Sequence, residues 1–268
     1  MRVTRLVFSL LLVLSSSPRL NSQQPVATPQ RDPQAVAVLT QMLTATGWGT
    51  SSHPTDATAI GTVTRATGDT PQSSAVTMKI KGARIYRIDV QDSSGPITTI
   101  INGDAGAVTR TAGTSFMPAH SAISQRAWAF PFFSDLSALS DTAVGFQYAG
   151  AETISGNLVH RVEITRSYSS SDPMSSLRSR VAHLTVWISA ATWLPLQVQF
   201  NRVSDDNPTA IRSLIRTFSD YRIVNGLAIP FHQEQFAAGQ LQQTLQLTSV
   251  SSNTGVSDSD FALPVVQN

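Results

Sequence analysis

Residues 215–236 read IRTFSDYRIVNGLAIPFHQEQF, two runs of alternating apolar and polar residues that meet at Asn225-Gly226. Asn and Gly tolerate the positive φ angles of a type I′ turn, and this dipeptide between alternating runs is the strongest short-range signal of a β-hairpin. We therefore expect two antiparallel strands joined by a tight turn. One face of the first arm carries Ile215, Thr217, Ser219, Tyr221 and Ile223, and one face of the second carries Leu227, Ile229 and Phe231.

Similar alternating runs continue on both sides of this hairpin. No strand-helix-strand alternation occurs, so a doubly wound parallel sheet is disfavoured. We expect about ten short strands in one curved antiparallel sheet with one apolar face. The Ser-rich segment from Ser167 to Arg180 is interpreted as a hairpin loop. The other expected strands lie at Val76–Ile80, Tyr86–Val90, Ile97–Ile101, Ala107–Thr111, Val144–Tyr148, Leu158–Ile164, Leu184–Ile188, Leu196–Phe200 and Leu241–Asn253.

Helical signals occur at two places. Asp32 can cap a helix that Pro33 opens, apolar residues follow at helical spacing, and Gly47 ends the run. The second place is central: Trp128, Phe130, Phe132 and Phe133 are followed by Leu136 and Leu139 at i, i+3. This aromatic segment must place its rings in an apolar environment. It is either an opening lid or a fixed plug over the apolar face of the sheet, and the sequence leaves both readings open.

The N-terminus has the pattern of a secretory signal. Arg2 and Arg5 precede the apolar run 6–14, which is shorter than the ~20 residues needed to span a bilayer, and small residues follow. We expect residues 1–22 to be a signal peptide, 23–32 a Pro/Gln linker and 33–268 one domain. An uncleaved anchor is the alternative. The protein is then periplasmic or secreted, with no stable membrane span in the mature chain.

Charge and cysteine content exclude several kinds of partner and site. Of the 19 Lys and Arg residues, Arg2, Arg5 and Arg19 precede residue 23, which leaves 16 against 17 Asp and Glu. A nearly neutral mature chain argues against a nucleic-acid partner. The chain has no cysteine, which excludes disulfides, a thiolate metal site and an acylated N-terminal cysteine.

Catalytic signatures are missing from the sequence. No HExxH or GxSxG motif occurs, and Asp205-Asp206 and the pair Asp258 and Asp260 lie in expected turns, where local hydrogen bonds explain them. We therefore expect no enzyme, no catalytic residue, no metal and no cofactor. Each histidine is interpreted as a satisfied or partly exposed side chain rather than a ligand; they are His53, His120, His160, His183 and His232.

The last third of the chain resembles the LolA/LolB-like periplasmic lipoprotein-carrier superfamily and related outer-membrane lipoprotein-sorting proteins. The segments that carry the resemblance are Val186–Ile188, Thr192–Leu196, Phe218–Arg222, Val224–Phe231, Asn253 and Phe261–Pro264. The resemblance implies an open half-barrel, mainly β (α+β), with an N-terminal helix and a central helical lid or plug on its concave face. It also implies binding of acyl chains there. Arg84 and Arg87 lie in strand positions where the carrier's functional arginine could fall, and no motif selects either.

We therefore expect an exported, non-enzymatic carrier or binding protein for a hydrophobic ligand, a lipid or a lipoprotein acyl chain, in the cell envelope. The alternative is an envelope scaffold or interaction module whose barrel is filled by its own side chains. An envelope protein partner is compatible with both. The expected cavity and lid residues are Met78, Tyr86, Trp128, Phe130, Phe132, Phe133, Leu136, Leu139, Leu184 and Val186.

Overall fold

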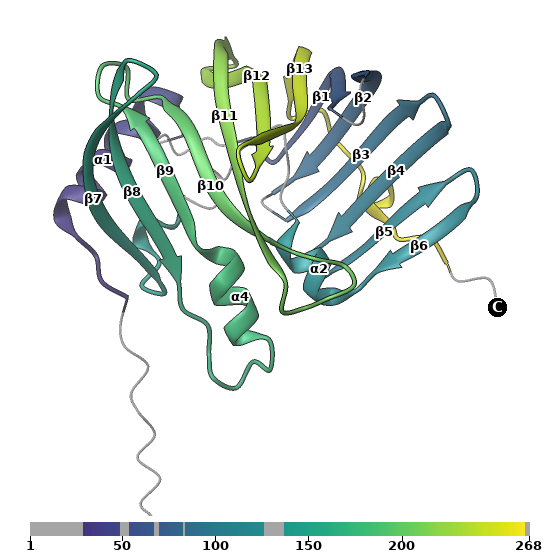
Figure 1. Cartoon of the computed structure of the whole chain (residues 1–268), viewed down its shortest axis with the longest axis horizontal. Helices are drawn as coiled ribbons and strands as arrows, with labels where there is room; N and C mark the ends of the chain where they lie inside the picture. Colours follow the sequence, from purple (N-terminus) through teal and green to yellow (C-terminus); the bar gives the residue numbers. More distant parts are fainter. Residues whose placement is uncertain (1–28, 49–53, 67–69, 83, 126–136, 266–268) are drawn as a thin grey trace, which may run out of the picture.

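The computed structural model describes residues 29–48, 54–66, 70–82, 84–125 and 137–265, and these residues form one open sheet of thirteen strands (Figure 1). All pairings between the named strands are antiparallel. The predicted signal peptide lies outside the described residues. The strands are β1 (Asp56–Arg65), β2 (Gln72–Lys81), β3 (Ile85–Asp92), β4 (Gly95–Asn102), β5 (Ala105–Arg110), β6 (Gly113–Met117), β7 (Val144–Ile154), β8 (Asn157–Arg166), β9 (Leu184–Ser189), β10 (Pro195–Val203), β11 (Ile211–Val224), β12 (Leu227–Ala237) and β13 (Gln240–Ser252).

The helices within the described residues are α1 (Pro33–Thr46), α2 (Ala119–Ser124) and α4 (Ser175–Ala182), with 3-10 turns η1 (Ser137–Ser140) and η2 (Asp258–Phe261). Within the described ranges, no helix combines the length and the apolar character needed to cross a bilayer.

The strand order has β6 and β7 at the two edges of the open sheet. It runs β6-β5-β4-β3-β2-β1-β13-β12-β11-β10-β9-β8-β7, so the chain steps outward from β1 to one edge at β6 and starts again at the other edge with β7. It then steps back until β13 pairs with β1. The connection 118–143 must therefore pass from one edge of the sheet to the other.

The central hairpin has the predicted turn. Asn225 and Gly226 adopt φ angles of 50° and 82°, and Val224 pairs with Leu227 across them. In the row predicted from Ile215 to Ile223, Ile215 is only partly buried and Ile223 is 71% exposed, whereas Tyr221 packs against the main apolar cluster. The buried face of β11 instead carries Leu214, Arg216 and Phe218.

Helix α1 begins and ends where the sequence predicts. The Asp32 carboxylate accepts a hydrogen bond from the Gln34 backbone N–H (2.8 Å), Pro33 occupies the first turn, and Gly47 ends the helix with φ of +80°. Such caps satisfy backbone groups that a helix end leaves unpaired. The inner side of the helix is fully buried at Ala35, Leu39 and Met42.

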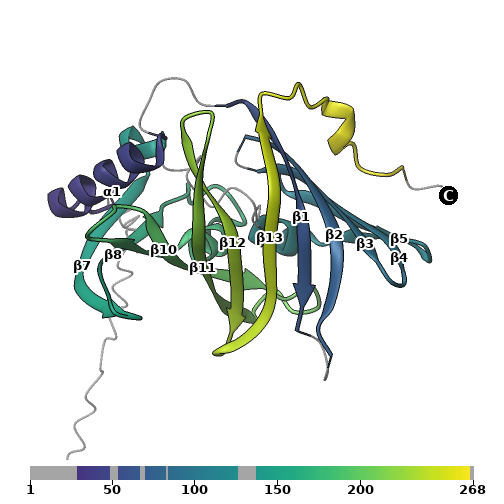
Figure 2. The same cartoon turned by 90° about the horizontal axis from the view of Figure 1, so that it is seen from above.

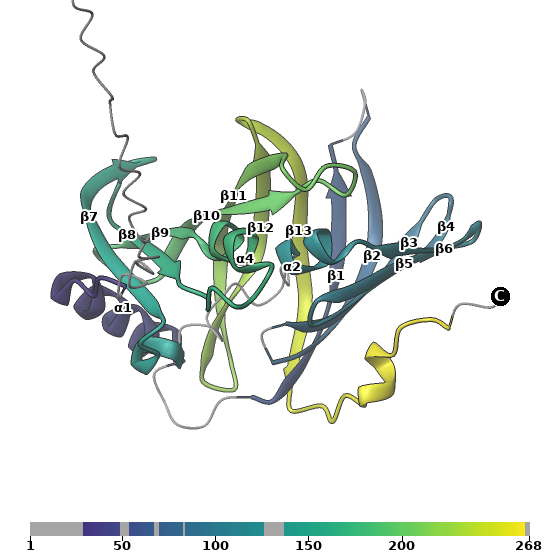
Figure 3. The ribbon, with the colours of Figure 1, turned by 90° about the horizontal axis from the view of Figure 1, so that it is seen from below.

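The buried face of the sheet is its concave face. Its alternating apolar side chains from β1–β4 and from β7–β13 join those of α1 in one continuous cluster. Figures 2 and 3 show the sheet bent into an open trough, with α2 and α4 near its middle and α1 beside β7 and β8.

Two expectations about secondary structure were wrong. The sheet has thirteen strands rather than about ten. Neither β1 nor β6 is among the expected strands, and in β6 only Phe116 and Met117 are large and apolar. The second half of the predicted Ser167–Arg180 loop is the helix α4. It forms because Leu177 and Val181, four residues apart, pack against Val203 of β10.

Candidate ligand-binding face

Four of the residues predicted to line the cavity lie on the concave face. Met78 of β2 and Tyr86 of β3 belong to one arm of the sheet, and Leu184 and Val186 of β9 belong to the other. All four are buried, with exposed fractions of 1–5%, and all are members of the cluster that contains α1. The structure therefore places all four in one packed apolar cluster on the concave face, and their role in lining a ligand cavity stays a prediction.

The predicted covering segment is only partly described. Leu139 of η1 is partly buried and packs against the same cluster. Trp128, Phe130, Phe132, Phe133 and Leu136 lie outside the described residues. Whether they form a lid or a plug stays a prediction.

Helix α1 covers one part of the hollow. At its start, Asp32 accepts a hydrogen bond from the Tyr148 backbone N–H of β7 (3.2 Å), and the Asp32 N–H donates to the Phe146 carbonyl (2.9 Å). At its end, Gly47 lies against the carbonyl of Gly226 in the β11–β12 turn. The helix thus reaches from the β7 edge to the central hairpin and covers the side chains between them.

The connection between the two sheet edges covers another part. Helix α2 contacts β5 on one arm, β10 on the other, and α4. His120 of α2 lies 3.1 Å from the carbonyl oxygens of Ser204 and Asp205, in the β10–β11 loop. Ala122 is buried in the main apolar cluster. The described part of the connection is therefore anchored on both arms.

An ion pair ties the two arms together at α4. The Arg178 guanidinium binds the Asp104 carboxylate of the β4–β5 turn through two nitrogens, and the Nη1–Oδ1 distance is 3.1 Å. Asp104 also pairs with Arg84 at 2.6 Å. The hydrogen bond from Arg178 is the main cause that lowers the pKa of Asp104, against a smaller opposing effect of burial. We call the Arg178–Asp104 pair the clasp.

An aromatic trio lies beside α1 on β7, β8 and the β9–β10 turn. The Tyr148 hydroxyl is 3.0 Å from Nδ1 of His160, and the His160 ring stacks on Trp193 with centroids 5.3 Å apart. His160 is thus a partnered strand histidine, as predicted. Among the described residues, no group of three or more His, Asp and Glu side chains is placed to hold a metal ion.

The buried polar side chains on the concave face were not predicted from the sequence. Arg216, Gln233 and Gln235 are 3%, 2% and 9% exposed, and they lie on β11 and β12 among apolar neighbours. The available signal was the alternation itself, because Gln233 and Gln235 continue the row Leu227, Ile229 and Phe231. These residues make the hollow amphipathic rather than uniformly apolar.

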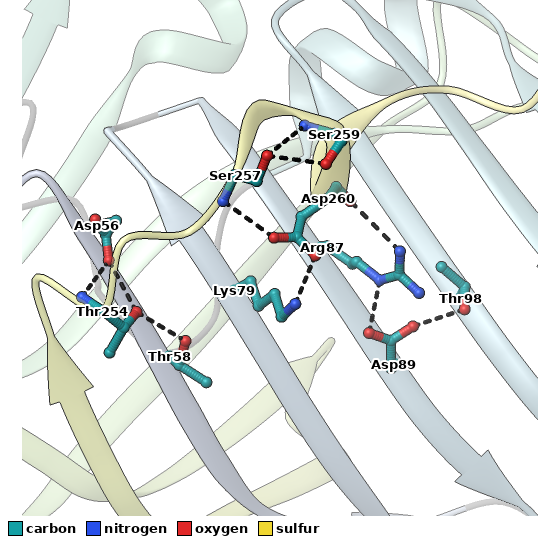
Figure 4. A network of polar contacts seen from close by, with 10 residues as sticks. All are labelled: Asp56, Thr58, Lys79, Arg87, Asp89, Thr98, Thr254, Ser257, Ser259 and Asp260. Atoms are coloured by element: carbon teal, nitrogen blue, oxygen red, sulfur yellow. Dashed lines mark hydrogen bonds and ion pairs between the residues drawn. The ribbon is translucent and has the colours of Figure 1, made fainter.

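The C-terminal segment lies on the opposite, outer face (Figure 4). Lys79 and Arg87 alternate with the concave residues of β2 and β3; Lys79 pairs with Asp260 at 2.6 Å, and Arg87 with Asp89 at 2.7 Å. The hydrogen bond from Lys79 is the main cause that lowers the pKa of Asp260. Arg87 is therefore not a residue of the hollow, and neither is Arg84, which binds Asp104 at the β4–β5 turn.

The fold matches solved structures at low sequence identity. A DUF1329-family protein from Desulfovibrio piger has a TM-score of 0.57 at 11% identity, covering 87% of this chain and 98% of that one. An outer-membrane lipoprotein-sorting protein domain from Vibrio parahaemolyticus has a TM-score of 0.54 at 13% identity, covering 85% and 96%. A LolA-superfamily protein from Nitrosomonas europaea has a TM-score of 0.53 at 12% identity, covering 85% and 97%.

Sequence comparison adds no closer relative. No family model matches the sequence, and no curated protein does. The likeness is thus one of fold, matched over most of each chain. The fold of this protein is that of LolA-superfamily proteins and lipoprotein-sorting domains.

Proposed function

We propose that this protein is an exported, non-enzymatic carrier or binding protein for a hydrophobic ligand, a lipid or a lipoprotein acyl chain, in the cell envelope. One observation carries the proposal: one connected cluster of buried apolar side chains extends over the concave face of both arms, and separate helical elements cover it rather than a second sheet. Such elements can move without breaking the strand ladders. The fold match to a lipoprotein-sorting domain and the N-terminal signal pattern support both the ligand class and the location.

Burial of an acyl chain can offset the burial lost when covering side chains are displaced. Displacing a covering side chain loses roughly 1.5–3 kcal/mol of burial for each large apolar group. An incoming acyl chain restores ~0.8 kcal/mol per methylene, so a long chain offsets several displaced side chains. The proposed contacts are Met78 and Tyr86 on one wall, Leu184 and Val186 on the other, and Leu139 with the aromatic segment as the cover.

A direct test uses the purified mature protein. Native mass spectrometry would look for co-purified lipid, and the delipidated protein would be titrated with a fluorescent fatty acid. We expect saturable binding that competing lipids displace. If the protein carries no lipid and binds none, the proposal is overturned and the self-filled scaffold is favoured.

The close packing of the described concave side chains makes that scaffold the relevant second candidate. Trp128→Ala separates the two. With a lid, the variant keeps its stability and changes ligand affinity; with a plug, it loses ~3–5 kcal/mol of unfolding free energy. Trp187→Ala is the matched control, because Trp187 is buried on the outer face, where its indole N–H donates to Glu152 (2.7 Å). It should lower stability without changing affinity.

A further inference from the structure

One end of the β7–β12 arm is built from three turns and helix α1. The turns join β7 to β8, β9 to β10 and β11 to β12, and they lie at the same end because two antiparallel strands separate each turn from the next (Figure 1). Helix α1 reaches this end, where Gly47 contacts the β11–β12 turn. We call the solvent-facing surface of α1 and of the turns 153–158, 190–194 and 223–226 the α1 edge.

The α1 edge is built from uncharged residues. Residues 33–55, 153–160, 181–201 and 223–233 contain no Asp, Glu, Lys or Arg, although these four residue types make up 13% of the chain. A helix on a protein surface normally carries charged residues on its outward side, so α1 is unusual. The exposed residues of α1 are Pro33, Gln34, Ala37, Thr40, Gln41 and Thr44.

The lack of charge is local to this edge. On the other arm, the β2–β3 turn carries Arg84 and the β4–β5 turn carries Asp104, and the two form an ion pair (2.6 Å). Charged residues also adjoin the α1 edge, but each acid there is neutralised by a base on its own hairpin. These ion pairs are Asp220–Arg222 (2.7 Å) and Glu152–Arg161 (3.5 Å).

Large apolar side chains project from the α1 edge. Ile223, just before the β11–β12 turn, is 71% exposed, and Leu158, just after the β7–β8 turn, is 56% exposed. Trp193 and Leu194 are partly exposed in the β9–β10 turn, which lies between them. A single exposed apolar residue needs no explanation, but several on one uncharged edge indicate an interaction surface.

We propose that the α1 edge docks on a lipid bilayer, with Ile223 and Leu158 inserted at the interface and α1 lying against the head groups. A charged side chain loses hydration when it enters this region, so an edge without charges enters more easily. The two apolar residues stand on strands separated by two others, which suits insertion into a fluid layer better than into a protein groove. Docking adds a surface to the proposed function and needs no bound ligand.

Vesicle flotation with the delipidated mature protein tests docking. Phosphatidylcholine vesicles are used at about millimolar lipid, because a few inserted side chains give only weak and reversible binding. An uncharged edge should bind these vesicles as well as vesicles that contain phosphatidylglycerol, and binding should change less than about twofold between about 50 and 500 mM salt. Binding that requires phosphatidylglycerol and falls with salt would overturn the proposal. No binding at all would also overturn it and would leave the edge to a protein partner.

Variants then locate the contact. Ile223→Asp and Leu158→Asp should each weaken vesicle binding by about tenfold or more. Phe116→Asp is the matched control, because Phe116 is also exposed (45%) but lies on β6 of the other arm. It should bind vesicles as wild type does. Equal losses in all three variants would contradict docking through the α1 edge.

A labelled residue gives a second readout that does not depend on affinity. The chain has no cysteine, so Ile223→Cys and Phe116→Cys can each be labelled at one position with an environment-sensitive dye. Only the dye at position 223 should shift its emission to the blue when phosphatidylcholine vesicles are added. A shift at position 116 alone, or at neither position, would overturn the proposal.

Fatty-acid titration of the same delipidated protein separates this inference from the proposed function. If wild type binds vesicles but no fatty acid, the carrier function fails and the docking surface stands. If wild type binds fatty acid but no vesicles, the docking surface is overturned and the carrier function stands. Ile223→Asp should lose vesicle binding and keep the wild-type affinity for fatty acid, because Ile223 lies outside the concave cluster.

Discussion

Gly47 at the end of α1 and Gly226 in the central hairpin are in direct contact. A Cβ atom on Gly47 would lie 2.2 Å from the Gly226 carbonyl oxygen, and Gly47 has φ of +80°. The helix that covers the hollow and the hairpin at the centre of the sheet therefore meet at a point that admits no side chain. The relative position of these two elements depends on that contact.

Gly47→Ala should accordingly lower the unfolding free energy by about 2–4 kcal/mol, because it adds left-handed backbone strain to a backbone clash. Urea denaturation measures the loss. Gly239→Ala is the control, since Gly239 has φ of +76° but nothing within 4 Å of its Cβ position. It should lose about 1 kcal/mol. Equal losses of unfolding free energy at the two sites would show that the close contact between Gly47 and Gly226 does not add to the cost of a side chain at position 47.

The elements that the sequence predicts well are those fixed by local chemistry. The turn at Asn225-Gly226 and the cap and stop of α1 at Asp32 and Gly47 depend on backbone preferences within a few residues, and the structure has them where expected. The antiparallel sheet was also predicted, because alternation with short turns leaves few other folds.

The features that sequence missed depend on contacts between distant segments. Alternation places Ile215, Tyr221 and Ile223 in one row of β11, but only the packing of distant segments decides that Tyr221 contacts the core while Ile223 is exposed. Arg216 was therefore not recognised as a buried residue. Helix α4 was missed for a related reason, since Leu177 and Val181 are buried by Val203 of another strand.

The clasp makes a prediction about opening. Arg178→Met removes the ion pair with Asp104 between α4 and the β4–β5 turn, together with the pair to Asp172 (2.8 Å) just before α4, so hydrogen exchange in residues 175–182 should become faster. Asp104 is 44% exposed, and exposed pairs contribute at most about 1 kcal/mol, which limits the effect to roughly fivefold. Arg161→Gln is the control, because its ion pair with Glu152 (3.5 Å) lies within the β7–β8 arm. An unchanged exchange rate in Arg178→Met would show that the clasp does not restrain α4.

Trp193 makes a prediction about backbone strain. Its φ of +59° is rare for a bulky residue, and its ring stacks on His160. Trp193→Ala loses the stacking and keeps the strained backbone, whereas Trp193→Gly loses the stacking and relieves the strain. The glycine variant should therefore be the more stable of the two by about 1 kcal/mol, the reverse of the usual order of Gly and Ala. Chemical denaturation of both variants measures the difference in unfolding free energy. A more stable alanine variant would show that the backbone at position 193 is not strained.

The C-terminal segment makes a prediction about pH. The hydrogen bond from Lys79 holds the pKa of Asp260 below its ordinary value of 3.8. A group with a lowered folded-state pKa stabilises the fold fully above the unfolded-state pKa, and that stabilisation is lost as the pH falls through the lowered value. Asp260→Asn should therefore be less stable than wild type near neutral pH, and the two should converge in acid, as the pH falls below the ordinary carboxyl pKa of 3.8. Urea midpoints measured across this range test the convergence.

Asp258→Asn is the control, because Asp258 is 89% exposed and its pair with Lys81 is screened by water. A difference between wild type and Asp260→Asn that persists unchanged in acid would show that the Asp260 carboxylate is not what fastens the segment to β2.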